Sequence, residues 1–424
     1  MNIVIKNGHV IDPANNINNK LDLYISAGKI AAIGQAPANF IADQSIDATD
    51  LIVAPGLVDL SARLREPGFE YKATLKSELQ AAVAGGVTSL ACPPDTEPTL
   101  DESGLVEMLK HRAKKLNLAN VYPIGALTKQ LQGSALTEMY ELTEAGCVGF
   151  SQANLSIVDT QVMWRAFEYA ATFGYTLFLR AEDPFLAKDG VAHDGETATR
   201  LGLKGIPAAA ESLALATILR IASETKTKVH ICRLSTAEGV DLVRKAKQQG
   251  LAVTADVSIN HLHLTDLDIG YFNTNTHLTP PLRSQRDKEA LISGLKDGSI
   301  DAICSDHSPV DDDAKLLPFA ESELGATGLE LLLPLTIKWA LDNKLDIALA
   351  LKLITHNAAK IMGIAAGNLS IGATADICIF DAKTYWKVVA SGLKSQGKNT
   401  PFLNMELPGR NHYTLIDGHI TFKN

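Results

Sequence analysis

Five charged side chains stand at or just beyond the ends of short apolar segments. They are, in chain order, Arg63, Arg65, Arg180, Arg233 and Asp306. A guanidinium group stays protonated and has no lone pair to give, so it cannot ligate a metal ion. It binds carboxylates through two parallel hydrogen bonds instead. If these segments bring their ends together, the residue types predict ion pairing or the binding of a small anion.

The histidines of the chain suggest few other metal or catalytic sites. His261 and His263 form the one His-x-His of the chain, and we interpret them as packed side chains, with a relocated metal site as the less favoured alternative. Asp306, His307 and Ser61 could be combined into a Ser/His/Asp set, but no Gly-x-Ser-x-Gly turn presents a nucleophile. His230 lies within an apolar segment and is interpreted as a core residue.

The elements that must position these residues alternate between two kinds. Short, continuously apolar segments predict buried parallel strands, and amphipathic segments between them predict helices. Eight such units indicate a (β/α)₈ TIM barrel, whose chemistry lies on the loops after the strands. The predicted strands are 51–60, 87–92, 121–125, 148–151, 176–180, 229–232, 252–257 and 301–305. The predicted helices are 74–84, 102–115, 159–172, 209–224, 237–248, 286–295 and 326–342.

The two ends of the chain differ from this pattern. Residues 1–50 and 366–424 contain short strands separated by glycine-rich turns. Neither end is long enough to bury a core alone, so we expect both to meet in one small β-sandwich domain. Residues 51–365 then form the barrel domain.

Composition excludes several classes of function. The net charge is −9 and the isoelectric point is about 5.7, which disfavours binding to nucleic acid or to an anionic membrane. No apolar stretch is long enough to cross a bilayer, and no signal peptide follows the first residues. The five cysteines are scattered and contain no Cys-x-x-Cys pair, which is typical of buried thiols in a reducing compartment. We therefore expect a cytoplasmic protein.

Several motifs resemble those of bacterial dihydroorotases in the amidohydrolase superfamily. They are VAPGLVDL at 53–60, LREPG at 64–68, TPPLR at 279–283 and SDHSP at 305–309. The similarity extends over essentially the whole chain. It implies a metal-dependent barrel of the amidohydrolase type with a β-sandwich made by both termini, in agreement with the segments above.

The resemblance also implies a set of zinc ligands, from which this sequence departs. The family places His-x-His after the first strand, where this chain has Ser61, Ala62 and Arg63. Its acidic residue or modified lysine after the fourth strand is replaced by residues 151–154 (SQAN). The histidines expected after the fifth and sixth strands are Arg180 and Arg233, and only Asp306 remains. One carboxylate cannot hold a catalytic zinc, so we expect no metal and no other cofactor.

We expect the new arginines to replace the charge of the metal. Arg63, Arg180 and Arg233 would then pair with Asp306 and with Glu182, because an unpaired buried charge is very costly. The alternative is that one or more of them turn out to solvent.

Substrate-binding positions are mixed. Arg65 matches the arginine that, by the resemblance, grips the substrate carboxylate. The family's asparagine after the second strand is Asp95, its asparagine before Pro-Pro-Leu-Arg is Thr279, and its late histidine is Val310. A negative charge at Asp95 would repel an anionic substrate.

These observations predict a non-catalytic homologue of dihydroorotase. Inactive chains of this type accompany bacterial aspartate transcarbamoylase, so the resemblance implies its catalytic chain as a partner in pyrimidine biosynthesis, and a structural or regulatory role. We also expect a homo-oligomer. Two alternatives stay open: a cyclic-amide hydrolase with an unorthodox site, and a module that senses a carboxylated ligand.

Overall fold

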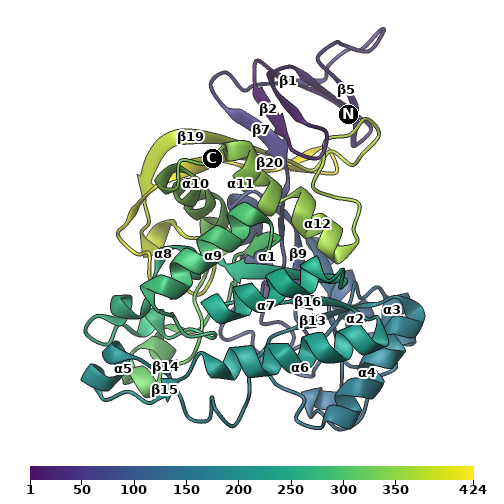
Figure 1. Ribbon diagram of the computed structural model, residues 1–424. Coiled ribbons are helices and arrows are strands. Elements are labelled where there is room, and N and C mark those ends of the chain that lie inside the picture. The colour runs from purple at the N-terminus through teal and green to yellow at the C-terminus, as the bar shows by residue number, and fades with distance from the viewer.

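A ring of eight parallel strands forms the centre of the larger domain in the computed structural model, which describes residues 1–424 (Figure 1). Neighbouring strands pair in chain order, and the ring closes where Ala62 bridges His307. The barrel strands are β8 (Leu57–Asp59), β9 (Val87–Cys92), β10 (Asn120–Pro123) continued by β11 (Gly125–Ala126), β12 (Phe150–Ser151), β13 (Thr176–Leu179), β16 (Lys228–Ile231), β17 (Val253–Ser258) and β18 (Ala302–Cys304). This confirms the predicted TIM barrel.

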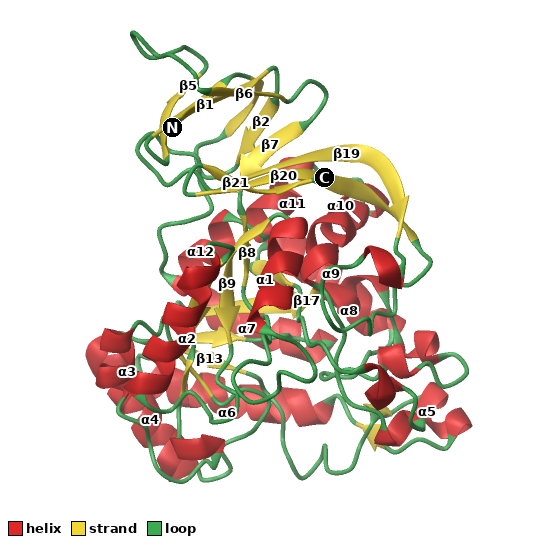
Figure 2. Ribbon diagram, turned by 180° about the vertical axis from the view of Figure 1, so that it is seen from behind, coloured by secondary structure: helices red, strands yellow, loops and turns green.

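Helices follow the barrel strands and cover them on the outside (Figure 2). α2 shows why: Val106, Leu109 and Ala113 are buried at helical spacing while the residues between them face solvent. The eight outer helices are α1 (Leu75–Ala84), α2 (Ser103–Leu116), α3 (Met139–Ala145), α4 (Thr160–Phe173), α6 (Ala209–Thr225), α7 (Ala237–Gln248), α9 (Gln285–Asp297) and α10 (Leu332–Asp342). Shorter helices are α5 (Glu196–Leu201), α8 (Ile259–His263), α11 (Ile347–Leu353) and α12 (His356–Met362). None of these helices combines the length and apolar character needed to span a membrane.

Both ends of the chain build the smaller domain, a sandwich of two sheets (Figure 2). One sheet has the order β5-β4-β1-β6 and the other the order β21-β20-β19-β7-β2-β3. The N-terminal strands are β1 (Asn2–Lys6), β2 (His9–Asp12), β3 (Ile17–Lys20), β4 (Leu23–Ser26), β5 (Lys29–Ile33), β6 (Gln44–Asp47) and β7 (Ile52–Pro55). The C-terminal strands are β19 (Ile377–Lys387), β20 (Glu406–Ile416) and β21 (His419–Lys423).

The larger sandwich sheet has two buried faces. On β19, Ile377 and Ile379 point into the sandwich core, whereas Cys378 and Phe380 belong to the main core of the barrel. This alternation follows the two-residue period of a strand. The sheet therefore joins the two domains, and Figure 1 shows its long strands arching over α10 and α11.

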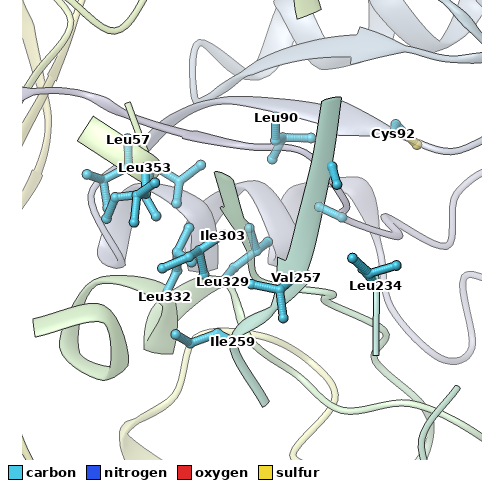
Figure 3. Packing of buried hydrophobic residues seen from close by; sticks show 14 of the residues in the cluster. Leu57, Leu90, Cys92, Leu234, Val257, Ile259, Ile303, Leu329, Leu332 and Leu353 are labelled. Atoms are coloured by element: carbon cyan, nitrogen blue, oxygen red, sulfur yellow. The ribbon is translucent and has the colours of Figure 1, made fainter. Parts of the chain in front are cut away.

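The main core fills the space between barrel strands and outer helices. Leu57, Leu90, Val257 and Ile303 from the strands belong to the same buried cluster as Leu332 of α10, and all of them are nearly inaccessible (Figure 3). Packing of this kind fixes the strand ends, and with them the side chains at the barrel mouth.

Two local predictions were wrong or incomplete. Residues 51–60 are not one barrel strand, because the chain leaves the sandwich sheet at Pro55 and enters the barrel at Leu57. Gly56 makes this crossing, and a Cβ there would lie 2.1 Å from the Oγ1 atom of Thr88. The helix predicted over 326–342 begins only at Leu332.

The structure also contains a segment that the sequence did not predict. Between β13 and α6 lie two short parallel strands, β14 (Ala192–His193) and β15 (Gly205–Ile206), with α5 between them. This segment has its own small apolar cluster around Ala192, Ile269 and Phe319.

Candidate functional site

Three ion pairs made by buried arginines lie at the barrel mouth, on the loops after the strands. The Nε of Arg63 donates to Asp95 at 2.7 Å, and the Nη1 of Arg233 donates to Asp306 at 3.1 Å. Arg180 pairs with Glu182 through its Nη2. The three arginine side chains are at most 6% exposed. Each guanidinium therefore has a carboxylate partner, and none of the three turns out to solvent.

Asn154, on the loop after β12, ties two of these pairs together. Its side-chain oxygen accepts from the Nη2 of Arg233 at 2.6 Å, and its backbone carbonyl accepts from the Nη1 of Arg180 at 3.1 Å. The sequence placed Asn154 near the site but did not predict this bridge. The Nη1 of Arg63 similarly donates to the Oγ of Ser308 at 3.2 Å.

Backbone strain helps to aim the site residues. Arg65, Arg233 and Asp306 have φ angles of 63°, 55° and 52°, in the left-handed region that residues with a Cβ seldom adopt. At Arg233 the strain is supported by a hydrogen bond, because its backbone N–H donates to the Oδ1 of Asp256 at 2.6 Å.

A polar network inside the barrel anchors Asp256. Its Oδ2 lies 2.9 Å from the Nε2 of His230, whose Nδ1 lies 2.8 Å from the Oγ1 of Thr254. The ligand atoms of His230, Cys232 and Asp256 lie within 4.8 Å of one another, which is a spacing that could hold a metal ion. Both nitrogens of His230 are already hydrogen-bonded, however, and burial raises the pKa of the Cys232 thiol. The group is thus satisfied as a core network.

Charges at the mouth stabilise one another. Burial alone would raise the pKa of Asp95, but the guanidinium groups of Arg63, Arg65 and Arg233 outweigh it and hold that pKa below its usual range. Burial opposes the charge of Arg233 as well, but the carboxylate of Asp306 together with the other acidic groups around it outweighs burial, so the pKa of Arg233 is raised. Both carboxylates therefore act as counter-charges.

Other residues singled out from the sequence have smaller parts. Arg65 donates from Nε to the carbonyl of Pro309 at 2.8 Å, and burial together with Arg63 lowers its pKa. Thr279 accepts from Arg233 through its backbone carbonyl, not through its side chain. Ser61 likewise contributes its carbonyl, to the backbone N–H of His307. Val310 is buried.

The histidines near the mouth face away from it or are held by carbonyls. His307 accepts at Nδ1 from the backbone of Gly328 at 3.0 Å, so its Nε2 carries the proton and donates to Glu78 at 2.7 Å. His261 and His263 donate from Nε2 to two different carbonyls, those of Pro281 and Leu335. Burial lowers the pKa of both to about 4. The pair does not converge on a common point, and no Ser/His/Asp set is formed.

The residues at the mouth do not fit a zinc ion. Catalytic zinc takes three protein ligands that are neutral imidazoles, thiolates or carboxylates. Here Arg63, Arg180 and Arg233 occupy the positions of the expected histidines, and each donates N–H groups to a carboxylate. Asp306 already forms an ion pair with Arg233. The other side chains at the mouth do not supply the ligands that a zinc ion needs.

Comparison with known proteins gives the family. A model of the dihydro-orotase-like family matches residues 50–239, and a model of the amidohydrolase family matches residues 188–421. A dihydroorotase-like protein of Pseudomonas aeruginosa is 44% identical over 421 residues, covering 99% of both chains. The chain belongs to the dihydroorotase-like amidohydrolases.

Two further relatives of this amidohydrolase place it in context. A dihydroorotase of Geobacter sp. strain M21 is 41% identical and covers the full length of both chains. Among solved structures, the L-hydantoinase (dihydropyrimidinase) from Arthrobacter aurescens has a TM-score of 0.88 at 23% identity, and the match covers 99% of this chain and 96% of that one. That structure supports the fold, a TIM barrel with a small β-sandwich.

Proposed function

We propose that this chain is a non-catalytic dihydroorotase homologue. The observation that carries the proposal is the set of ion pairs at the mouth, formed by Arg63, Arg180 and Arg233. These arginines stand where the resemblance to dihydroorotases implies histidines. Hydrolysis of a cyclic amide at neutral pH needs a water made acidic by a metal. The mouth residues supply no ligand set for that metal and no free general base.

We further propose that the chain is a structural or regulatory subunit of an aspartate transcarbamoylase complex in the cytoplasm. Inactive dihydroorotase-like chains accompany that enzyme in bacteria. A full-size barrel whose mouth is filled by ion pairs can still act through its outer surface. Four of its five free cysteines are buried, as suits thiols that stay reduced.

Two measurements test the first proposal. The purified protein, dialysed against zinc and then against metal-free buffer, should retain no stoichiometric zinc, and it should not open the ring of dihydroorotate. A variant carrying Ser61→His, Arg63→His, Arg180→His and Arg233→His restores imidazoles at the four positions and serves as the positive control for zinc retention. Turnover of dihydroorotate by the unaltered protein at the rate of a normal enzyme would end the proposal.

Association is tested separately. The chain should co-purify with the aspartate transcarbamoylase catalytic chain of the same cell, and the transcarbamoylase should lose activity or assembly when this chain is removed. If the two chains never co-elute and the transcarbamoylase is fully active alone, the subunit role is wrong even where the non-catalytic role stands.

A second candidate function, sensing of a small carboxylate, is favoured by one observation. The Nε atoms of Arg180 and Arg233 are buried and donate to no protein group. The mouth holds four arginines, Arg63 and Arg65 included, against the carboxylates of Asp95, Glu182 and Asp306. Titration calorimetry with small carboxylates is the measurement for this candidate, and no heat of binding would exclude it.

A further inference from the structure

A cavity of about 400 Å³ lies where α8, α9 and α10 meet the loop between β19 and β20, residues 388–405. α8 contacts both α9 and α10, and Figure 1 shows the three helices on the outside of the barrel. The mouth residues Arg63, Arg180, Arg233 and Asp306 do not line this cavity. It is called here the α8–α10 pocket, and its volume suits a small organic molecule.

Apolar side chains from three parts of the fold contribute to the lining. They are Trp339 of α10, Ile292 of α9, and Phe402 and Met405 of the loop. Trp339 and Phe402 are each 1% exposed, and the ring of Phe402 meets the imidazole of His263 edge-on, with centroids 6.0 Å apart. Aromatic surface of this kind favours the binding of a ring or of a short hydrocarbon body, because the ligand loses apolar contact with water.

The indole N–H of Trp339 is an unused hydrogen-bond donor. Its Nε1 is buried and has no acceptor within the chain, although a buried indole nitrogen usually finds one. A buried donor without a partner destabilises the folded state. Because Trp339 lines the pocket, an acceptor atom bound there would satisfy this group.

Two other residues of the lining keep hydrogen-bonding capacity. The half-buried Lys288 donates from Nζ to the carbonyl of His263 at 3.0 Å and forms no ion pair with a carboxylate. An ammonium group has three donors, so two remain. His263 itself donates from Nε2 to the carbonyl of Leu335, and burial lowers its pKa to about 4. Its imidazole is therefore neutral, and its Nδ1 remains an acceptor.

The charges in the lining favour a negative ligand. Asp342 already pairs with Lys338 at 2.8 Å, and Asp268 accepts from the backbone N–H of Thr265 at 2.7 Å. Lys288, in contrast, is a cation that has only a carbonyl as its partner. A carboxylate is the group that an ammonium in this position binds best.

We propose that the α8–α10 pocket binds a small organic anion, with a flat or short apolar body and one carboxylate. The body packs against Trp339 and Phe402, and the carboxylate oxygens accept from the Lys288 ammonium and the Trp339 indole N–H. The proposal rests neither on the transcarbamoylase assignment nor on carboxylate sensing at the mouth, since the pocket shares no arginine with the mouth.

Benzoate is the probe for this inference, because it joins a flat ring to one carboxylate. In a variant that keeps only Trp339 (Trp164→Phe with Trp386→Phe), titration with benzoate should change the tryptophan fluorescence. The expected Kd is on the order of 1–10 mM, as suits so small a ligand. Benzyl alcohol keeps the ring but has no charge, and it should bind several-fold more weakly. Benzoate held only at the mouth would leave the fluorescence of Trp339 unchanged.

Two variants locate the carboxylate. Lys288→Gln, made in the same background, should weaken benzoate at least about fivefold and leave benzyl alcohol unchanged, because only a charge-assisted hydrogen bond is lost. The matched control is Lys352→Gln, which removes an exposed lysine of α11 outside the lining and should alter neither affinity. Trp339→Phe keeps a ring but removes the donor. Followed by saturation-transfer NMR, it should also weaken benzoate several-fold.

Three outcomes would overturn the inference. The first is no change in the fluorescence of Trp339 up to about ten times the expected Kd, which would leave the pocket to water. The second is Lys288→Gln binding benzoate as tightly as its parent variant. The third is equal affinity for benzoate and benzyl alcohol, which would make the pocket an apolar recess without preference for an anion.

Discussion

Asp306 is the least exposed of the three paired carboxylates at the barrel mouth. Its side chain is 6% exposed, and that of its partner Arg233 is 4% exposed. Removing one member of a buried pair leaves the other charge uncompensated, which typically costs about 3–5 kcal/mol. Asp306→Ala should therefore lower the free energy of unfolding by about that amount, measured by urea denaturation.

The matched controls separate charge from packing. Replacing both partners, Arg233→Met with Asp306→Leu, should cost far less than Asp306→Ala alone, because no charge is left buried. Arg220→Ala removes one member of an exposed helical pair and should change stability by less than about 1 kcal/mol. If Asp306→Ala costs no more than this surface change, the pair does not hold the mouth together.

His261 gives a second test at the residue scale, through pH. Burial lowers its pKa to about 4 from the ordinary 6.5, so between these values the unfolded chain binds a proton that the folded chain does not. This histidine therefore reduces stability as pH falls from 6.5 towards 4. The stability of His261→Gln, relative to the unaltered protein, should rise over that interval.

Asp59 should behave with the opposite sign. Burial raises its pKa to about 6 from 3.8, against the hydrogen bonds from Ser305. The folded chain then holds a proton that the unfolded chain has lost, so this carboxyl reduces stability as pH rises from 3.8 towards 6. Asp59→Asn should gain relative stability over that rise. Parallel pH profiles for the two variants would contradict both assignments.

At the scale of elements, the crossing from sandwich to barrel is the most constrained point. A Cβ at Gly56 would lie 2.1 Å from the Oγ1 of Thr88, which is fully buried and cannot move aside. Overpacking of this kind usually costs about 1–3 kcal/mol. Gly56→Ala should lower the urea midpoint accordingly.

Gly104 is the matched control for that substitution. It lies in α2 with nothing within 4 Å of an added Cβ, so Gly104→Ala should be neutral or stabilising by up to about 1 kcal/mol. Equal midpoints for the two glycine variants would show that Thr88 of β9 makes room for a Cβ at Gly56 without cost.

The barrel elements were predictable because burial on both faces leaves a continuous apolar segment, as in β9, where all six residues are buried. The break at Gly56 could not be predicted, because the residues on both sides of it are apolar. Nothing local distinguishes a sandwich strand from a barrel strand. The positions of Arg63, Arg180, Arg233 and Asp306 followed from strand ends. Arg180 and Arg233 pair with Glu182 and Asp306, the carboxylates expected from the sequence, but Arg63 pairs with Asp95 instead. That partner and the bridge at Asn154 depend on tertiary contacts, so they could not be read from spacing.

At the scale of the whole molecule, the shared sheet should make the two domains unfold together. β19 contributes Ile379 to the sandwich core and Phe380 to the barrel core, and β20 packs on α10. Losing either core therefore exposes a face of the same sheet. The barrel core contains residues of the sandwich strands, among them Ala54, Phe380 and Leu407, so it is incomplete without that sheet.

Two tryptophans can report on the two sides of this junction. Trp164 lies on α4 of the barrel, and Tyr413→Trp places a tryptophan on β20, where Tyr413 packs against the sandwich core. In two variants that share Trp339→Phe and Trp386→Phe, one keeps only Trp164, and the other carries Trp164→Phe with Tyr413→Trp. In each variant the fluorescence transition in urea should have the same midpoint as the transition followed by circular dichroism, because coincident transitions mark a single cooperative unit. Since Trp339 is buried in α10, both variants should unfold at lower urea than the unaltered chain. A fluorescence midpoint for the Tyr413→Trp variant that falls clearly before its circular dichroism midpoint would mean that the sandwich unfolds alone, and the sheet would then be an attachment to the barrel instead of part of its core.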